Sequence, residues 1–358
     1  MKNFQASLQL FLRHCFAVLC MVTLVFLPGL TLQAQQDASS VTTTAGSSAV
    51  SDNSANKWAI AIHGGAGGPV RGTLADSTEA AYLAKLDEAL RVGVKILSDG
   101  GKSLDAVEAV VKFMEDCPLF NAGIGAVLNE NGYAELDASI MDGQTGMAGA
   151  VAGVKTIKNP IALARLVMEK TPHVMLIGTG AEDFAKTTGI KMVAPSYFIT
   201  PARLEAWKKW KSGQKGGSER NEKHGTVGAV ALDQNGNLAA ATSTGGMTGK
   251  MAGRIGDSPV IGAGTYANNN TCAVSATGHG EYFIRNVVAY DLSAMMQYRE
   301  MTLKKAAEEI IMEKLRSQKA TGGLIAVDKD GNISMPFNTN SMFRGMAIST
   351  GEFEVSIY

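Results

Sequence analysis

The chain has 358 residues, and its 33 lysines and arginines are balanced by 33 aspartates and glutamates, so the formal net charge at pH 7 is zero. This balance argues against a dedicated nucleic-acid binder, which would carry a basic excess. Apolar residues make up 46% of the chain and charged residues only 18%. Such a composition suits a sizeable core and argues against a disordered chain or a coiled coil.

Residues 1–34 have the pattern of a secretory signal peptide. Basic residues precede an almost unbroken apolar run from Cys15 to Leu27, and Ala34 offers a cleavage site. The run is short for a helix that spans a membrane, although an uncleaved anchor is the alternative. Residues 35–56 are rich in Ser, Thr, Ala and Gln, which predicts a flexible tether. We expect a secreted or periplasmic protein whose mature form has no membrane segment.

The remainder, residues 57–358, is predicted to fold as a single domain. An apolar strand over residues 57–62 leads into a glycine-rich turn, and helical spacing predicts a helix over 75–98. Ser103 is expected to cap a second helix. Two more helices are predicted where a capping residue precedes a proline, at Asn159-Pro160 and Thr200-Pro201.

Residues 211–225 contain no apolar side chain and are predicted to form a mobile linker. An apolar hairpin follows abruptly over residues 226–243, and a similar strand–turn–strand pattern recurs over 323–335. Long helices are predicted between the two hairpins, over 281–298 and 302–318. Antiparallel hairpins separated by helices predict a layered α/β fold with antiparallel sheets, rather than a doubly wound parallel sheet.

Metal and disulfide chemistry are weakly indicated. Cys117 and Cys272 are the cysteines of the predicted domain, and neither belongs to a CxxC pair, so we expect small core residues rather than a zinc site. The histidines form no HExxH motif and no i,i+4 pair. There is also no Gly-x-Ser-x-Gly nucleophile elbow.

Three stretches between residues 224 and 280 couple hydroxyl or charged side chains to glycine: 242–246, 253–259 and 277–281. Glycine lets a substrate lie against backbone N–H groups, as an oxyanion site requires. Ordinary turns are the alternative explanation for each stretch.

The junction between Gly225 and Thr226 has a chemical interpretation of its own. A threonine hydroxyl can attack the carbonyl of the preceding residue, and glycine at that position offers the least steric resistance. Cleavage through an ester would free the α-amine of Thr226, whose ordinary pKa is roughly 7.7–8.0. This amine could then act as the base for the hydroxyl of the same residue.

At this point the motifs resemble the N-terminal-nucleophile, plant-type L-asparaginases, also called isoaspartyl peptidases. The segments that carry the resemblance are HGGAG (63–67), NAGIGAV (121–127), LDA (136–138), HGTVGAV (224–230), TSTGG (242–246), GRIGDSP (253–259) and TGHGE (277–281). The resemblance implies a four-layer αββα sandwich. It also implies autocleavage between Gly225 and Thr226 into an α subunit (35–225) and a β subunit (226–358), and a homodimer of αβ units.

The resemblance also implies roles for individual residues. Thr226 would be the nucleophile and Thr244 would tune it, while the Thr277 hydroxyl and the Gly278 N–H would form the oxyanion hole. The substrate-binding residues would be Arg254 for the α-carboxylate, Asp257 for the α-ammonium, Gly280 and Asn121. No organic cofactor is expected; a structural sodium ion would be held by the backbone carbonyls of Met114, Glu115, Cys117, Phe120, Ala122 and Ile124.

The implied reaction is hydrolysis of the side-chain amide of L-asparagine, or of β-aspartyl dipeptides, to L-aspartate through a β-aspartyl-Thr226 intermediate. The opposite charges of Arg254 and Asp257 suit a zwitterionic amino acid, although a mutual salt bridge within a turn is the alternative. A glycosylasparaginase acting on sugar-linked asparagine is the closest rival function. A non-catalytic amino-acid binding protein that never cleaves itself is a more distant one.

Overall fold

The computed structural model describes residues 57–214 and 225–358. The predicted signal peptide and tether (1–56), His224 and most of the predicted linker lie outside the described residues. The linker was expected to begin at residue 211, but helix α6 (Pro201–Gln214) continues through its first four positions. None of the helices within the described ranges is long and apolar enough to cross a membrane.

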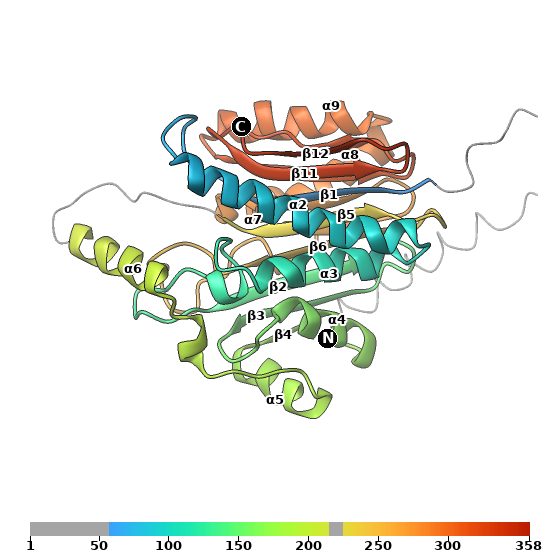
Figure 1. The fold of residues 1–358 in the computed structure, drawn as a ribbon. Coiled ribbons are helices and arrows are strands. Elements are labelled where there is room, and N and C mark those ends of the chain that lie inside the picture. Colours follow the sequence, from blue (N-terminus) through green and yellow to red (C-terminus); the bar gives the residue numbers. More distant parts are fainter. Residues whose placement is uncertain (1–56, 215–224) are drawn as a thin grey trace, which may run out of the picture. The chain divides into compact units, whose positions relative to one another are not determined.

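Two sheets form the centre of the fold (Figure 1). The larger has eight strands in the order β12-β11-β1-β5-β6-β2-β3-β4, and the smaller has four in the order β10-β9-β8-β7. All neighbouring strands are antiparallel except β3 and β4, which are parallel. The strands of the larger sheet are β1 (Ala59–Ala66), β2 (Leu136–Asp142), β3 (Ala148–Val154), β4 (Met175–Ile177), β5 (Val227–Leu232), β6 (Leu238–Thr244), β11 (Met342–Ile348) and β12 (Phe353–Ser356). Those of the smaller sheet are β7 (Thr265–Ala267), β8 (Cys272–Gly278), β9 (Gly322–Asp328) and β10 (Ile333–Ser334).

Helices cover the outer face of each sheet, while the inner faces pack against each other. The larger sheet carries α2 (Asp76–Ser98), α3 (Ser103–Glu115), α4 (Pro160–Lys170) and α5 (Gly178–Thr188). The smaller sheet carries α7 (Gly280–Asn286), α8 (Val288–Arg299), α9 (Leu303–Glu308) and a π-helical turn (Glu309–Leu315). The predicted αββα sandwich is therefore confirmed.

Strand β5 shows why the sequence folds in this way. Val227, Ala229 and Ala231 face the helices, whereas Val230 and Leu232 face the second sheet. Side chains of a strand alternate between its two faces, so a strand buried on both faces is a continuous apolar run. Such a run is what the sequence shows, and both predicted hairpins are present as β5–β6 and β9–β10.

Several local predictions need correction. The Ser103 side chain does not cap α3; instead its backbone N–H donates to Asp233 Oδ2 at 3.0 Å. Asn159 makes no side-chain cap for α4; the Ile161 N–H in the first turn donates to Glu115 Oε1 at 3.0 Å instead. The single helix predicted over 281–298 is broken at Val287, where φ is 50°, giving α7 and α8. Thr200 behaves as expected, since its hydroxyl accepts from the Arg203 N–H at 3.3 Å.

Both cysteines of the domain, Cys117 and Cys272, are buried and free, as predicted for small core residues.

Candidate active site

Thr226 lies directly before β5, at the centre of the larger sheet, and is almost fully buried. Its hydroxyl donates to Thr244 Oγ1 at 3.0 Å. Thr244 ends the neighbouring strand β6 and also accepts from the Gly246 N–H at 3.0 Å. The hairpin thus brings together two of the hydroxyls that the sequence placed in one site and fixes the orientation of the Thr226 hydroxyl.

The peptide bond between Gly225 and Thr226 is tightly surrounded. The Asn121 N–H donates to the Gly225 carbonyl oxygen at 3.1 Å. On another side Gly65, with φ of 108°, approaches so closely that a Cβ on it would lie 2.4 Å from the Gly225 Cα. Glycine at position 65 is required both by its backbone conformation and by this contact.

The side chain of Asn121 is hydrogen-bonded to backbone groups at both of its polar atoms. Its Oδ1 accepts from the Val127 N–H at 2.9 Å, and its Nδ2 donates to the Gly246 carbonyl at 2.7 Å. Its own carbonyl accepts from the Gly245 N–H at 3.0 Å. Asn121 thus ties the loop after α3 to the loop after β6.

His63, in β1, is a contact of Thr226 that analysis of the sequence did not identify. Its Nδ1–H donates to the Thr226 carbonyl at 3.0 Å, which leaves Nε2 to accept from the Ser275 hydroxyl at 2.9 Å. Burial lowers the pKa of His63 to about 3, although the hydrogen bond to Thr226 acts in the opposite direction. The neutral ring links Thr226 to strand β8 of the second sheet, and only the HGGAG resemblance could have indicated it.

The second sheet contributes Thr277 and Gly278 at the end of β8. Thr277 is fully buried, and its Oγ1 accepts from the Ala66 N–H at 3.2 Å, so its hydroxyl proton remains available for donation. Gly278 lines a small pocket together with Thr226, Thr244, Arg254 and Asp257. The structure therefore brings the predicted nucleophile, its neighbour and both charged residues into one place.

Arg254 does not form the salt bridge with Asp257 that was considered as an alternative. Its Nε and Nη2 donate to the two carboxylate oxygens of Glu281 at 2.9 and 3.0 Å. Partial burial raises the pKa of Glu281 and is the largest single effect, but the hydrogen bond and charge of Arg254, a backbone hydrogen bond and the charge of His279 together hold that pKa below its usual value. Glu281 is half-exposed, so this pair contributes about 1 kcal/mol or less.

Asp257 is buried, and its Oδ2 has no hydrogen-bond partner among the described residues. Burial raises the pKa of this carboxyl to about 7, against the opposing effects of a backbone hydrogen bond and the Arg254 charge. A Cβ on Gly280 would lie 2.9 Å from Asp257 Oδ1 and 3.0 Å from Arg254 Nη2. Because Gly280 has no Cβ, the Asp257 carboxyl and the Arg254 guanidinium can face the same small space.

The segment from Met114 to Ile124 comprises the end of α3 and the loop after it, and its backbone offers several carbonyl oxygens. A Cβ on Gly123 would lie 2.1 Å from the Glu115 carbonyl oxygen, so the loop folds back tightly on its own backbone. The Met114 and Ala122 carbonyls each accept one backbone hydrogen bond and keep a second lone pair. Within the described ranges no cluster of three or more His, Cys, Asp or Glu could hold a metal. A carbonyl donor set of this kind fits a hard cation such as sodium.

Comparison with known proteins agrees with this site. The sequence model of the family described as asparaginase matches residues 56–357. The isoaspartyl peptidase of Salmonella typhimurium is 49% identical over 310 residues, which cover 85% of this chain and 99% of that protein. The human isoaspartyl peptidase/L-asparaginase is 46% identical over 287 residues, covering 79% of this chain and 91% of the human protein. The family model spans nearly all of the described residues, and the relatives favour this branch over glycosylasparaginase; the chain belongs to the asparaginase family.

Proposed function

We propose that this chain is a self-processing amidohydrolase that converts L-asparagine and β-aspartyl dipeptides to L-aspartate. The observation that carries the proposal is the shared pocket in which the Thr226 hydroxyl, already bonded to Thr244, faces Arg254 and Asp257. The relatives named isoaspartyl peptidase and L-asparaginase support the same substrate classes. Side-by-side turnover of L-asparagine, a β-aspartyl dipeptide and a sugar-linked asparagine tests the proposal. Turnover of the sugar conjugate alone would contradict it.

Self-processing begins with attack of Thr226 Oγ on the Gly225 carbonyl carbon. The Asn121 N–H, already 3.1 Å from that carbonyl oxygen, would stabilise the negative charge that develops on it. The C–N bond breaks, the acyl group moves to the threonine oxygen as an ester, and the nitrogen takes up the proton released by the hydroxyl and becomes a free amine. Water then hydrolyses the ester, leaving a carboxylate on Gly225 and an N-terminal Thr226.

The released α-amine then serves as base for substrate hydrolysis. It takes the proton of Thr226 Oγ as the oxygen attacks the side-chain carbonyl of the substrate. The Thr277 hydroxyl and the Gly278 N–H would bind the resulting oxyanion. Collapse expels ammonia, or the amine of an amino acid, which receives the proton. Water completes the cycle by releasing L-aspartate from the ester.

Arg254 and Asp257 would hold the amino-acid head of the substrate. The Arg254 fork matches a carboxylate and would exchange Glu281 for it. Asp257 Oδ2, which has no partner among the described residues, offers an acceptor to the ammonium group. A bound cation would favour the ionised form of this carboxyl.

The protonation of Asp257 predicts a specific pH dependence of binding. Below its pKa of about 7 the carboxyl is neutral and must lose a proton before it can pair with an ammonium group. The product L-aspartate should therefore inhibit about tenfold more weakly at about pH 6 than at about pH 8. Succinate, which lacks the α-ammonium, is the control, and its inhibition should not become weaker at the lower pH. The same loss for both inhibitors would show that Asp257 is not responsible.

The close approach of Gly65 predicts a defect in processing. In Gly65→Ala the new Cβ would displace Gly225, and a misplacement of about 1 Å can cost roughly 10²-fold in rate. The rate of self-cleavage, measured by gel electrophoresis of samples taken over time, should fall by about that factor. Gly72→Ala is the matched control, because Gly72 also has a positive φ, of 80°, but nothing lies within 4 Å of its Cβ position. Equal cleavage rates in the two variants would contradict the assigned contact.

Three further features are proposed on the strength of the sequence and the family resemblance. The 114–124 loop would hold a sodium ion through the carbonyls of Met114, Glu115, Cys117, Phe120, Ala122 and Ile124. The ion would take no part in bond making; it would fix the loop that carries Asn121. The mature protein would be exported and would form a homodimer of αβ units.

A further inference from the structure

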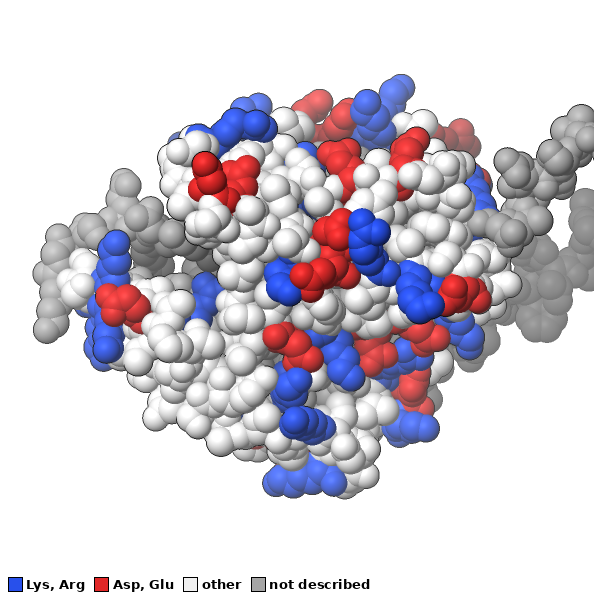
Figure 2. Space-filling view, viewed as in Figure 1, with Lys and Arg blue, Asp and Glu red and all other residues white. Residues whose placement is uncertain are grey.

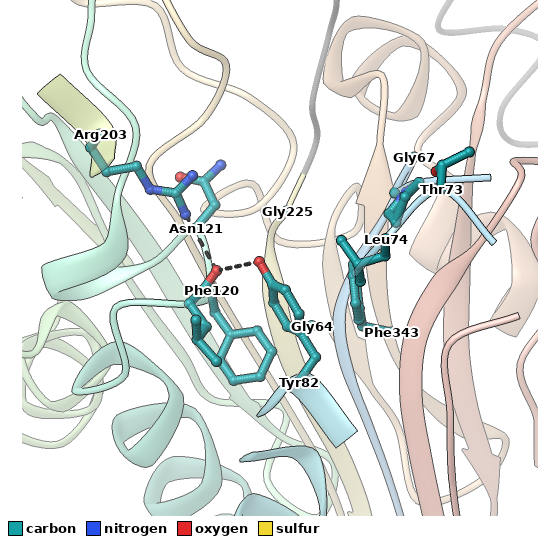
Figure 3. Close-up of a pocket in the computed structure, with 13 residues that line it drawn as sticks. Gly64, Gly67, Thr73, Leu74, Tyr82, Phe120, Asn121, Arg203, Gly225 and Phe343 are labelled. Atoms are coloured by element: carbon teal, nitrogen blue, oxygen red, sulfur yellow. Dashed lines mark hydrogen bonds between the residues drawn. The ribbon is translucent and has the colours of Figure 1, made fainter. Parts of the chain in front are cut away.

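A cavity of about 430 Å³ lies beside Gly225, separate from the pocket that holds Arg254 and Asp257. In Figure 3, Arg203 and Asn121 form one side, Thr73, Leu74 and Phe343 lie opposite, and Tyr82 and Phe120 lie between them. Six of the thirteen lining residues are aromatic or aliphatic, four are glycines, and Arg203 is the one cation among them. The volume suits a single amino-acid residue and is larger than ammonia requires.

Arg203 is the cation of this cavity and has no carboxylate partner among the described residues. Its Nε donates to the Gly125 carbonyl, and its Nη2 makes a long contact of 3.5 Å with the Leu119 carbonyl. The Leu119 carbonyl also accepts from the Tyr82 hydroxyl at 3.2 Å. These bonds fix the guanidinium from one side, and no described residue accepts from its Nη1.

The lack of an anion is unfavourable for a guanidinium that is partly buried, as that of Arg203 is. Burial lowers the pKa of Arg203, which the Tyr82 hydroxyl only partly offsets. A buried cation is ordinarily compensated by a paired anion. Arg254, by comparison, forms a salt bridge with Glu281.

The chemistry of the proposed reaction decides which part of a substrate reaches this cavity. The leaving amine must receive its proton from the nitrogen of Thr226, so it departs on that side of the nucleophile. Gly225 is the residue attached to that nitrogen, and Gly225 lines the cavity. The amino-acid head lies in the other pocket, which Thr226 lines with Arg254 and Asp257. The two spaces therefore meet at the peptide bond that processing cuts.

We propose that this cavity is the leaving-residue subsite: it takes the amino acid joined to the β-carboxyl of an aspartyl dipeptide, and Arg203 binds the α-carboxylate of that residue. The aromatic wall would accept an apolar side chain such as leucine. This inference rests on the proposed function. It adds that specificity between dipeptides and asparagine resides in Arg203, because asparagine releases only ammonia and leaves the subsite empty.

The test compares three substrates with wild-type protein and Arg203→Met: β-aspartyl-leucine, its C-terminal amide and L-asparagine. In the wild type, the dipeptide with a free carboxylate should have a kcat/KM about tenfold or more above that of its amide. Arg203→Met should lose at least about tenfold on the free-acid dipeptide, mainly through KM, and erase its advantage over the amide. The variant's fold-loss of kcat/KM on L-asparagine should be about ten times smaller than its fold-loss on the free-acid dipeptide. Each preparation is first shown to be cleaved into two subunits.

Arg71→Met is the matched control, since Arg71 packs over the Tyr358 ring and does not line the cavity. It should leave the order of the three substrates unchanged. Equal losses on all three substrates in Arg203→Met would assign Arg203 a structural role and overturn the subsite, as would no loss on the free-acid dipeptide. If the wild type cleaves none of the three, the proposed function itself fails, which is a different result.

Discussion

Replacement of Thr226 by alanine is expected to abolish both self-cleavage and hydrolysis. The variant lacks the oxygen that attacks Gly225, so the chain stays intact and no α-amine is released. Turnover of L-asparagine and of β-aspartyl dipeptides should fall by roughly 10⁴- to 10⁶-fold, the scale seen when a nucleophile is removed from an enzyme of this kind. Loss of the bond from Thr226 to Thr244 affects one hydroxyl pair, so the fold should persist.

Thr226→Ser is the matched control, because it keeps the hydroxyl and removes only the methyl group. It should cleave itself and turn over substrate at a reduced rate. Circular dichroism and thermal unfolding of both variants would establish that they fold. Appreciable hydrolysis by folded, uncleaved Thr226→Ala would contradict the role given to Thr226.

Replacement of Arg254 by leucine is expected to lower kcat/KM for L-asparagine by about 10²-fold or more. Removing one partner of a hydrogen-bonded charge pair in a binding site commonly costs about 2–5 kcal/mol, and Arg254 is the charged group proposed for the α-carboxylate. Self-cleavage should continue, because Arg254 makes no hydrogen bond to Gly225 or Thr226 within the described residues. Steady-state kinetics on the processed variant measure the effect.

A substrate without the carboxylate provides the control for Arg254. β-Alaninamide retains the amine and the side-chain amide of asparagine but has no α-carboxylate. The wild type should process it poorly, and Arg254→Leu should process it no worse than the wild type does. An equal proportional loss on L-asparagine and β-alaninamide would indicate that Arg254 supports the pocket rather than binding the carboxylate.

The position of the site follows from how the two sheets pack. Thr226 precedes β5 of the larger sheet, and Thr277 and Gly278 end β8 of the smaller one. Gly228 lets the sheets approach, since a Cβ there would lie 2.0 Å from Ser275 Oγ. The bond from His63 to Ser275 passes through this gap and links both layers to the Thr226 carbonyl. The nucleophile is thus held by contacts from each sheet.

Local patterns could be predicted from the sequence because each depends on near neighbours. The β5–β6 hairpin is an apolar run, a turn and a second run, and its register sets Thr244 beside Thr226. The expected roles of Arg254 and Asp257 came from the resemblance, and the structure places both in one pocket with Thr226.

Contacts between distant segments could not be predicted. Glu281 stands in a recognised motif, yet nothing local indicates that it pairs with Arg254 across 27 positions. His63 and Thr226 are separated by 163 positions, and their contact depends on β1 pairing with β5. Arg203 lies on α6, whose composition predicts an exposed helix, and only tertiary packing places it at a cavity beside Gly225. No periodicity in the sequence indicates such contacts between distant segments.

The central claim is that Thr226 becomes an N-terminal nucleophile by cutting its own chain. The most direct measurement is the mass of the purified wild-type protein under denaturing conditions. We expect two fragments that divide between Gly225 and Thr226, the smaller one running from Thr226 to Tyr358. A single uncleaved chain after prolonged incubation, or fragments with another boundary, would contradict the claim.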